Sequence, residues 1–212
     1  MQVLGIIGSM RKGKITETLV RRVIEEMANL GASVTSELVH TRDLTCHPCR
    51  VVCHEANCSA RLFGCSIDDD AMDVLARMKA ADAIVIGAPH YFRGPPAGFH
   101  TMIERLQAMA FFHEAAGPSD EESPLLDKPC GLIGVCEYSN PQAILEYLHD
   151  FCMLLKMRPI RLRSFPYLGV GAHGEIETDE VFRPLERSTE LASALAAAVR
   201  AQMHPSGGQR AA

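Results

Sequence analysis

The stretch VLGIIGSMRKGKIT, residues 3–16, decides the fold. Its apolar run at 3–8 predicts a buried strand, and the apolar residues that follow over 16–30 recur at helical spacing. A short loop containing glycine, serine and three cations joins the two. A strand followed by a short loop and a helix is the unit from which parallel sheets are built.

The same alternation continues along the chain. Further strands are predicted at 33–40, 83–87, 130–135 and 160–165, and further helices at 69–80, 98–109, 141–156 and 179–202. Five strands connected by helices predict an α/β fold, a doubly wound five-stranded parallel sheet. We expect a single domain over 1–203 with a cysteine-rich loop at 45–66, followed by a disordered tail at 204–212.

Composition and charge narrow the class of protein. Hydrophobic residues make up 47% of the 212 residues and charged residues 22%, which is typical of globular domains. The net charge of −5 gives no electrostatic reason to expect nucleic acid or an anionic membrane as a partner. No stretch reaches the roughly 18 to 20 apolar residues of a membrane span, and the N-terminus lacks the charged region of a signal peptide. We therefore expect a cytoplasmic protein, in which a disulfide framework would be out of place.

The loop at 8–16 is a candidate phosphate site. Backbone amides at the start of a helix, hydroxyls and cations attract an anion, and the candidate residues are Ser9, Arg11, Lys14 and Thr16. The nucleotide-binding Gly-Lys-Ser/Thr pattern is not matched, since Ile15 separates Lys14 from Thr16, and the dinucleotide Gly-x-Gly-x-x-Gly pattern is absent. The alternative is an ordinary turn with exposed cations.

Two more loops follow predicted strands at the same edge of the sheet, where such folds bind ligands. The loop at 87–96 carries Pro89, His90, Tyr91, Phe92 and Arg93, which suits a flat apolar ring. The alternative is a proline-rich turn whose aromatic side chains complete the core. His90 could donate a hydrogen bond or a proton near such a ring, or it could have a packing role. The loop at 136–140 is short and polar, with similar alternatives.

Five of the eight cysteines fall within twenty residues, and the aspartates at 68–70 follow them. Thiolates at this spacing can converge on one soft metal centre, either an iron–sulfur cluster or zinc. The candidate ligands are Cys46, Cys49, Cys53, Cys58 and Cys65. Because His47 and His54 could also be ligands, zinc stays an alternative to the cluster. A segment without any metal is the third alternative. The other cysteines, Cys130, Cys136 and Cys152, are interpreted as buried core residues, although Cys136 could have a redox role beside a ligand.

The order of these motifs resembles the NADPH-dependent FMN reductase family, in particular its iron–sulfur flavoprotein branch, over about residues 1–200. The resemblance rests on the Gly8-Ser9-x-Arg11 loop, the cysteines running into paired aspartates, and GAPHYF at 87–92 before MIER at 102–105. It implies a flavodoxin-like fold with strand order 2-1-3-4-5, non-covalent FMN, and dimers or dimers of dimers.

The resemblance also implies roles for individual residues. Ser9, Arg11 and Thr16, with Lys14 beside them, would hold the FMN phosphate. The isoalloxazine ring would be lined by residues of the loop after the third strand and, at its far edge, of the loop after the fourth: Pro89, His90, Tyr91, Phe92, Arg93, Glu137, Tyr138, Ser139 and Asn140. His90 is the candidate catalytic residue.

The chain also departs from the family pattern. Ile15 replaces a residue that is often small and polar, and His100 replaces the usual lysine. The third gap in the cysteine run is longer than the family's, so there are two candidates for the fourth ligand. Cys58 preserves the span from Cys46, whereas Cys65 preserves the distance to Asp69 and is slightly favoured. A [4Fe–4S] cluster is expected, with zinc and no metal as alternatives.

We therefore expect an FMN-dependent oxidoreductase that passes electrons between a reduced donor such as NAD(P)H, FMN and a [4Fe–4S] cluster. The alternatives are an FMN-dependent dehydrogenase or reductase of a small metabolite or quinone, and a non-enzymatic flavodoxin-like electron carrier. The expected partner is a small-molecule substrate or a redox protein. Phe92, Pro95, Pro96 and the apolar residues at 109–112 would form an exposed patch, so we expect at least a homodimer.

Overall fold

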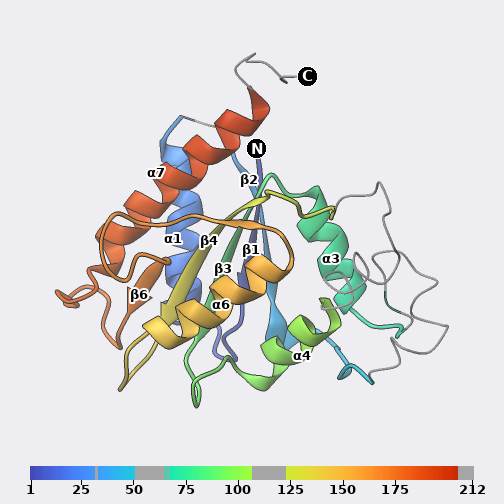
Figure 1. Cartoon of the computed structure of the whole chain (residues 1–212). Helices are drawn as coiled ribbons and strands as arrows, with labels where there is room; N and C mark the ends of the chain where they lie inside the picture. The colour runs from blue at the N-terminus through green and yellow to red at the C-terminus, as the bar shows by residue number, and fades with distance from the viewer. Residues whose placement is uncertain (32, 51–64, 66, 107–122, 205–212) are drawn as a thin grey trace.

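The computed structural model describes residues 1–31, 33–50, 65, 67–106 and 123–204. Its centre is a parallel sheet in the order β2-β1-β3-β4-β5, with β6 also paired to β4 (Figure 1). This is the predicted order of a flavodoxin-like fold. The strands are β1 (Gln2–Ile7), β2 (Thr35–His40), β3 (Ala83–Pro89), β4 (Pro129–Val135), β5 (Arg158–Pro159) and β6 (Val170–Ala172).

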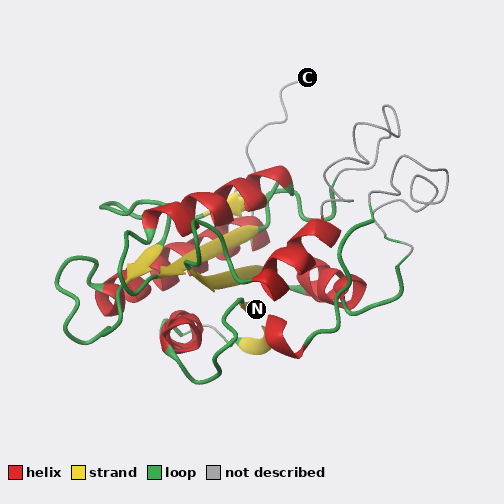
Figure 2. Cartoon of the chain, turned by 90° about the horizontal axis from the view of Figure 1, so that it is seen from below, coloured by secondary structure: helices red, strands yellow, loops and turns green. Residues whose placement is uncertain are grey.

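Helices cover both faces of the sheet, as the view in Figure 2 shows. On one face lie α1 (Ile15–Asn29) and α7 (Pro184–Met203), which pack against each other and against β3 and β4. On the other face lie α3 (Ala71–Ala80), α4 (Ala97–Leu106) and α6 (Gln142–Leu154), with the 3₁₀ turn η1 (Thr41–Asp43) beside α4.

Alternation along the strands divides the core into two layers. In β1, Leu4 and Ile6 face the α3, α4 and α6 side, while Val3 and Ile7 face the α1 and α7 side. Both faces of β3 and β4 are buried throughout. This burial explains why these two strands have continuous apolar sequences, as expected for a parallel sheet covered on both sides.

The predicted fifth strand at 160–165 is wrong. Two short strands share that edge instead: Pro159 pairs with Cys130 of β4, and Val170 pairs with Ile133 further along the same strand. Between them the chain forms a turn in which the Tyr167 N–H bonds the Ser164 carbonyl. Pro159 and Pro166 have no N–H to donate to a ladder, so an unbroken strand is disfavoured here.

The last helix begins at Pro184 rather than at the predicted residue 179. Asp179 instead accepts hydrogen bonds from the Phe182 and His173 N–H groups and holds the preceding turn. Pro184 then occupies the first turn of the helix, where a missing N–H costs nothing. The central part of the predicted cysteine-rich loop and the tail after residue 204 lie outside the described residues.

Within the described part of the chain, no helix is both long enough and apolar enough to cross a membrane.

Candidate functional site

The loop between β1 and α1 is the first component of the site. At its start the Gly8 N–H bonds the Gly87 carbonyl of β3 at 2.7 Å, so the loop begins at the carboxyl edge of the sheet. At its end Lys14 is the N-cap of α1, and its side chain makes no capping hydrogen bond. The first-turn amides of a helix have no acceptor within the helix, and they attract an anion.

Two predicted hydroxyl residues, Ser9 and Thr16, are buried in this loop. The Ser9 hydroxyl oxygen accepts a hydrogen bond from the Arg11 N–H, with 3.2 Å between Oγ and N, and this contact shapes the turn. Thr16 packs closely against β3: a Cβ added to Gly87 would meet the Thr16 methyl carbon at 3.0 Å and Val20 at 2.7 Å. Glycine at position 87 therefore lets the first turn of α1 lie directly on the sheet.

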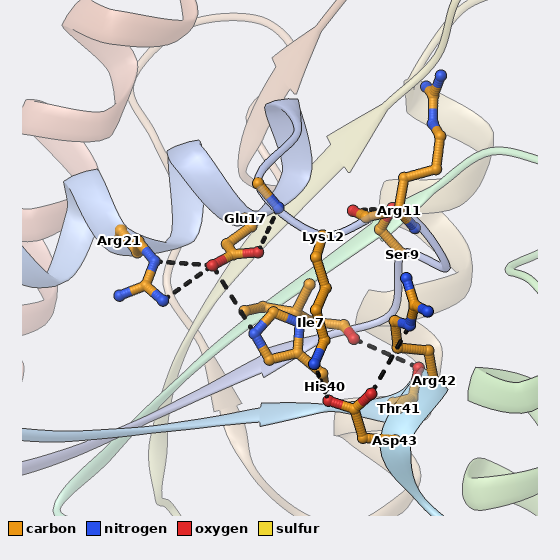
Figure 3. Close-up of polar contacts among 11 residues, drawn as sticks. Ile7, Ser9, Arg11, Lys12, Glu17, Arg21, His40, Thr41, Arg42 and Asp43 are labelled. Carbon is orange, nitrogen blue, oxygen red and sulfur yellow. Dashed lines mark hydrogen bonds and ion pairs between the residues drawn. The ribbon is translucent and has the colours of Figure 1, made fainter.

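The cations of the loop differ in how they are used (Figure 3). Lys12 pairs with Asp43 at 2.5 Å. Arg42, which lies in η1 outside the loop, supports the loop by donating to the Met10 carbonyl at 2.9 Å. Arg11 is exposed, and its guanidinium points away from these contacts; it has no acidic partner among the described residues. Lys14 is likewise exposed. Arg11 and Lys14 are thus the loop cations available to an anion.

Glu17 anchors the loop from inside the first turn of α1, a role that the sequence analysis missed. Its carboxylate accepts the Gly13 N–H at 2.7 Å and lies 2.9 Å from Arg21 Nε (Figure 3). Gly13 has a φ of +64°, a left-handed conformation that favours glycine. The Gly13 N–H, aided by Arg21 and His40, lowers the pKa of Glu17 although burial opposes this. An ionised carboxylate therefore fixes the turn.

The loop after β3 is a tight two-residue turn. Tyr91 and Gly94 exchange backbone hydrogen bonds of 2.7 and 2.9 Å, and the residues between them have positive φ angles, 48° for Phe92 and 70° for Arg93. Glycine and asparagine normally occupy such positions, so this backbone is strained. The turn exposes Tyr91, Phe92 and Arg93, whereas Pro89 is buried at the end of β3. Strained loops of this kind concentrate at functional sites.

The loop after β4 is linked to the β3 loop through His90. The His90 Nδ1 atom lies 2.8 Å from the Ser139 hydroxyl, and the Nε2 atom is buried without a partner among the described residues. The Ser139 carbonyl accepts a hydrogen bond from the Cys136 thiol at 2.5 Å and lies 3.0 Å from His173 Nε2. Glu137, Tyr138, Ser139 and Asn140 are all exposed. Ser139 is therefore held between two histidines.

A hollow of about 540 Å³ lies beside this loop. Its walls are the exposed loop after β4 and residues before α7: Glu137, Tyr138, Ser139, Asn140, His173, Val181 and Phe182. The His173 ring stands edge-on to Phe182 with 4.7 Å between the centroids. Three predicted loops and this hollow thus share the carboxyl edge of the sheet.

Of the predicted metal ligands, Cys46, Cys49 and Cys65 are described, whereas Cys53 and Cys58 lie outside the described residues. Within the described part of the chain, no group of three or more potential ligands comes together. Burial, with Asp69 and Asp70 nearby, raises the pKa of the Cys46 thiol to about 11. Cys130 and Cys152 are buried as predicted, and so is Cys136, whose pKa burial also raises.

Comparisons with known proteins bear on the family and the fold of the chain. Residues 1–166 match the model of the NADPH-dependent FMN reductase family. An iron–sulfur flavoprotein of Methanocaldococcus jannaschii is 26% identical over 207 residues, covering 94% of this chain and 98% of the relative. An iron–sulfur flavoprotein of Archaeoglobus fulgidus is 37% identical over 106 residues, 50% of this chain and 48% of that protein.

Solved structures share the fold. RosB, solved with a bound 8-demethyl-8-formylriboflavin-5′-phosphate intermediate, superposes with a TM-score of 0.68 at 15% identity, covering 97% of this chain and 81% of RosB. The azoreductase AzrA superposes with a TM-score of 0.62 at 16% identity, covering 92% of this chain and 99% of AzrA. A flavodoxin-like WrbA-like protein of Agrobacterium tumefaciens has a TM-score of 0.58 at 17% identity, covering 94% of this chain and 97% of that protein.

Proposed function

The chain belongs to the NADPH-dependent FMN reductase family and is an FMN-dependent oxidoreductase; from that premise we propose that it is an iron–sulfur flavoprotein. In this proposal it passes electrons between a reduced donor such as NAD(P)H, FMN and a cysteine-ligated [4Fe–4S] cluster. FMN, when bound, supplies the ability to take up two electrons as a hydride and to release them singly.

The geometry of the β1–α1 loop is the main structural support for FMN binding. An α1 N-terminus without a side-chain cap, two buried hydroxyl residues and the outward-pointing Arg11 fit a phosphate group. Ser9, Arg11 and Thr16, with Lys14 at the N-cap, would hold that phosphate. Glu17 keeps the Gly13 turn in place from below.

The loops after β3 and β4 would hold the flavin ring. Pro89, Tyr91, Phe92 and Arg93 would contact one part of it, and the loop at 137–140 the other. His90 would be the residue that holds or moves a proton at the ring, because its Nδ1 atom is occupied by Ser139 while its Nε2 atom has no partner among the described residues.

The proposed iron–sulfur cluster is supported by the sequence and by the names of relatives rather than by the geometry of a site. Five cysteines within twenty residues have the chemistry of a soft metal centre, and the relatives from M. jannaschii and A. fulgidus are named iron–sulfur flavoproteins. The described cysteines Cys46 and Cys65 both lie near Arg105, although they enter from opposite ends of the segment. Zinc remains the competing metal.

A second candidate function is an FMN-dependent reductase of a small metabolite or quinone. The hollow between the β4 loop and Phe182 supports it, since it lies beside the proposed flavin edge and could hold a small planar molecule. We also propose a homodimer, because the turn after β3 leaves Tyr91 and Phe92 exposed next to the proposed ring site. Of the rest of the expected patch, Pro95 is half-buried, Pro96 is buried, and residues 109–112 lie outside the described residues.

Flavin binding tests the proposal most simply. Wild type should quench FMN fluorescence and reject riboflavin, which has no phosphate. Arg11→Ala removes a charge-assisted contact worth about 1.5–3 kcal/mol, so FMN affinity should fall roughly tenfold or more. Arg200→Ala, on the last turn of α7, is the matched control and should bind FMN as wild type does. Equal affinity for FMN and riboflavin would contradict a phosphate site.

Donor and acceptor assays then separate the candidate functions. Anaerobic NADH or NADPH should bleach the FMN absorption of the purified protein. Steady turnover with an artificial one-electron acceptor would support an enzyme, whereas reduction only by another reduced protein would support an electron carrier.

A further inference from the structure

Arg105 is a fully buried arginine that the flavin site does not use. It lies on α4, with 1% of its surface exposed, on the same side of the sheet as α3 (Figure 1). Its Nη1 atom donates to Asp69 Oδ2 at 2.5 Å and to the His47 carbonyl at 3.0 Å. Its Nη2 atom donates to the Ile67 carbonyl at 3.1 Å. One guanidinium thus contacts both ends of the cysteine-bearing segment.

The two aspartates at the end of the segment reinforce this contact. Asp69 accepts the His47 N–H at 2.8 Å and the Ala71 N–H at 3.1 Å. Asp70 accepts the Thr45 N–H at 2.6 Å, and its own N–H bonds the Thr45 carbonyl at 3.2 Å. We call these contacts, together with those of Arg105, the neck of the segment. The contacts of Asp69 with His47 and of Asp70 with Thr45 join residues 22 and 25 positions apart.

The charges at the neck are matched. Burial opposes the charge on Asp69, but the His47 and Ala71 N–H groups and Arg105 outweigh it and lower the pKa of Asp69. Burial also opposes the charge on Arg105, yet Asp69 and the Cys65 thiol raise the pKa of Arg105. A buried ion pair is costly unless it is fully hydrogen-bonded, and the Arg105 Nε atom is buried without a hydrogen-bond partner among the described residues. We therefore assign the pair a role in fixing position rather than in adding stability.

Two cysteines lie at this neck, one at each end of the segment. Cys46 stands between Thr45 and His47, whose N–H groups Asp70 and Asp69 accept. Cys65 is a side-chain hydrogen-bond partner of Arg105, and Cys46 lies within the electrostatic influence of Arg105, Asp69 and Asp70. Thiolate ligands bring negative charge to a metal centre, and the Arg105 guanidinium offsets part of that charge. At Cys46, burial together with Asp69 and Asp70 outweighs Arg105 and raises the pKa of the thiol, so the neck supplies position rather than an activated thiolate.

We propose that Arg105 is a positioning residue: with Asp69 and Asp70 it closes the neck and holds Cys46 and Cys65 ready to ligate one metal centre. The hydrogen bonds of the neck are made by protein groups alone, so we expect them to offset the entropy cost of bringing the segment's ends together before a metal binds. The proposal includes Cys65 among the ligands. Its metal part rests on the proposed iron–sulfur function, whereas the closure of the neck does not.

Hydrogen exchange of metal-free protein tests the closure. The amides of Thr45 and His47 are held by the side chains of Asp70 and Asp69, so they should exchange slowly in wild type. In Arg105→Met both should exchange faster, by about tenfold or more. Arg77→Met is the matched control, because it removes an arginine–carboxylate pair with Glu37 on the surface. Wild-type exchange at both amides in Arg105→Met would overturn the closure.

Metal retention tests the positioning role. After anaerobic reconstitution, Arg105→Met should hold less iron and show weaker visible cluster absorption than wild type while keeping its FMN. Asp70→Asn weakens only the Thr45 contact and should also hold less iron than wild type. This variant still tests the proposal if Arg105→Met fails to fold. Wild-type iron content in both variants, or parallel loss of FMN and iron, would overturn the proposal. A wild type that binds no iron would refute the cluster, while the exchange result would still decide the closure.

Discussion

Replacing Glu17 with alanine should loosen the phosphate loop and destabilise the whole domain. The carboxylate is buried and accepts the Gly13 N–H at 2.7 Å, a charge-assisted hydrogen bond worth about 1.5–3 kcal/mol. Its pair with Arg21 counts for much less, at most about 1 kcal/mol, because the Arg21 side chain is 51% exposed and screened by water. We expect Glu17→Ala to lower the free energy of unfolding by about 2–3 kcal/mol.

Urea denaturation of flavin-free and metal-free protein measures this loss. Glu26→Ala is the matched control, since Glu26 pairs with Arg22 four residues away on the same helix but has no backbone contact among the described residues. That control should cost no more than about 0.5 kcal/mol. If the free energy of unfolding falls equally in both variants, the Gly13 hydrogen bond does not contribute the stability assigned to it, which would refute the prediction.

The same carboxylate predicts a pH dependence. The Gly13 N–H lowers the pKa of Glu17 below its ordinary value of 4.5, so folding favours the ionised form. Its stabilisation is therefore fully present above pH 4.5 and is lost as the pH falls through the lower, folded-state pKa. The stability gap between wild type and Glu17→Gln should be constant near neutrality and narrow in acid. A gap that widens in acid would contradict this sign.

Three further variants probe the rest of the site. Thr16→Val removes one buried hydroxyl, and we expect FMN binding by fluorescence quenching to weaken about tenfold. His90→Gln should leave FMN affinity unchanged but slow the anaerobic reduction of FMN by NAD(P)H, measured by stopped flow; an unchanged rate would exclude a proton role. Phe92→Ser should shift the dimer towards monomer in light scattering, and a wild type that is only the 23.2 kDa monomer at micromolar concentration would refute the proposed interface.

The sequence predicted most of the fold because local pattern and burial agree along it. Continuous apolar runs identify β3 and β4, which are buried on both faces, and helical spacing identifies α1. The edge of the sheet was mispredicted for a tertiary reason. Whether residues 158–172 pair with β4 depends on where that strand offers partners, and the two short stretches that pair cannot be found from their own composition.

The site was predicted at the level of loops but not of their internal contacts. Parallel topology brings the carboxyl ends of β1, β3 and β4 to one edge, so the three loops could be assigned together. Arg105 was noted only as the last residue of the MIER motif; its buried pairing was missed because its partner Asp69 lies 36 residues away and nothing in a helical repeat marks a buried charge. Glu17 did leave a signal, since it interrupts the apolar face of α1 next to Thr16 and Leu19.

The central claim is that one chain binds both FMN and a cysteine-ligated iron cluster. Anaerobic purification followed by flavin, iron and zinc analysis of the same sample tests it directly. The account predicts one FMN and about four irons per chain, with cluster absorption beside the flavin bands. One zinc and no iron would contradict the cluster while sparing the flavin site, and a protein with neither flavin nor metal after reconstitution would contradict the account as a whole.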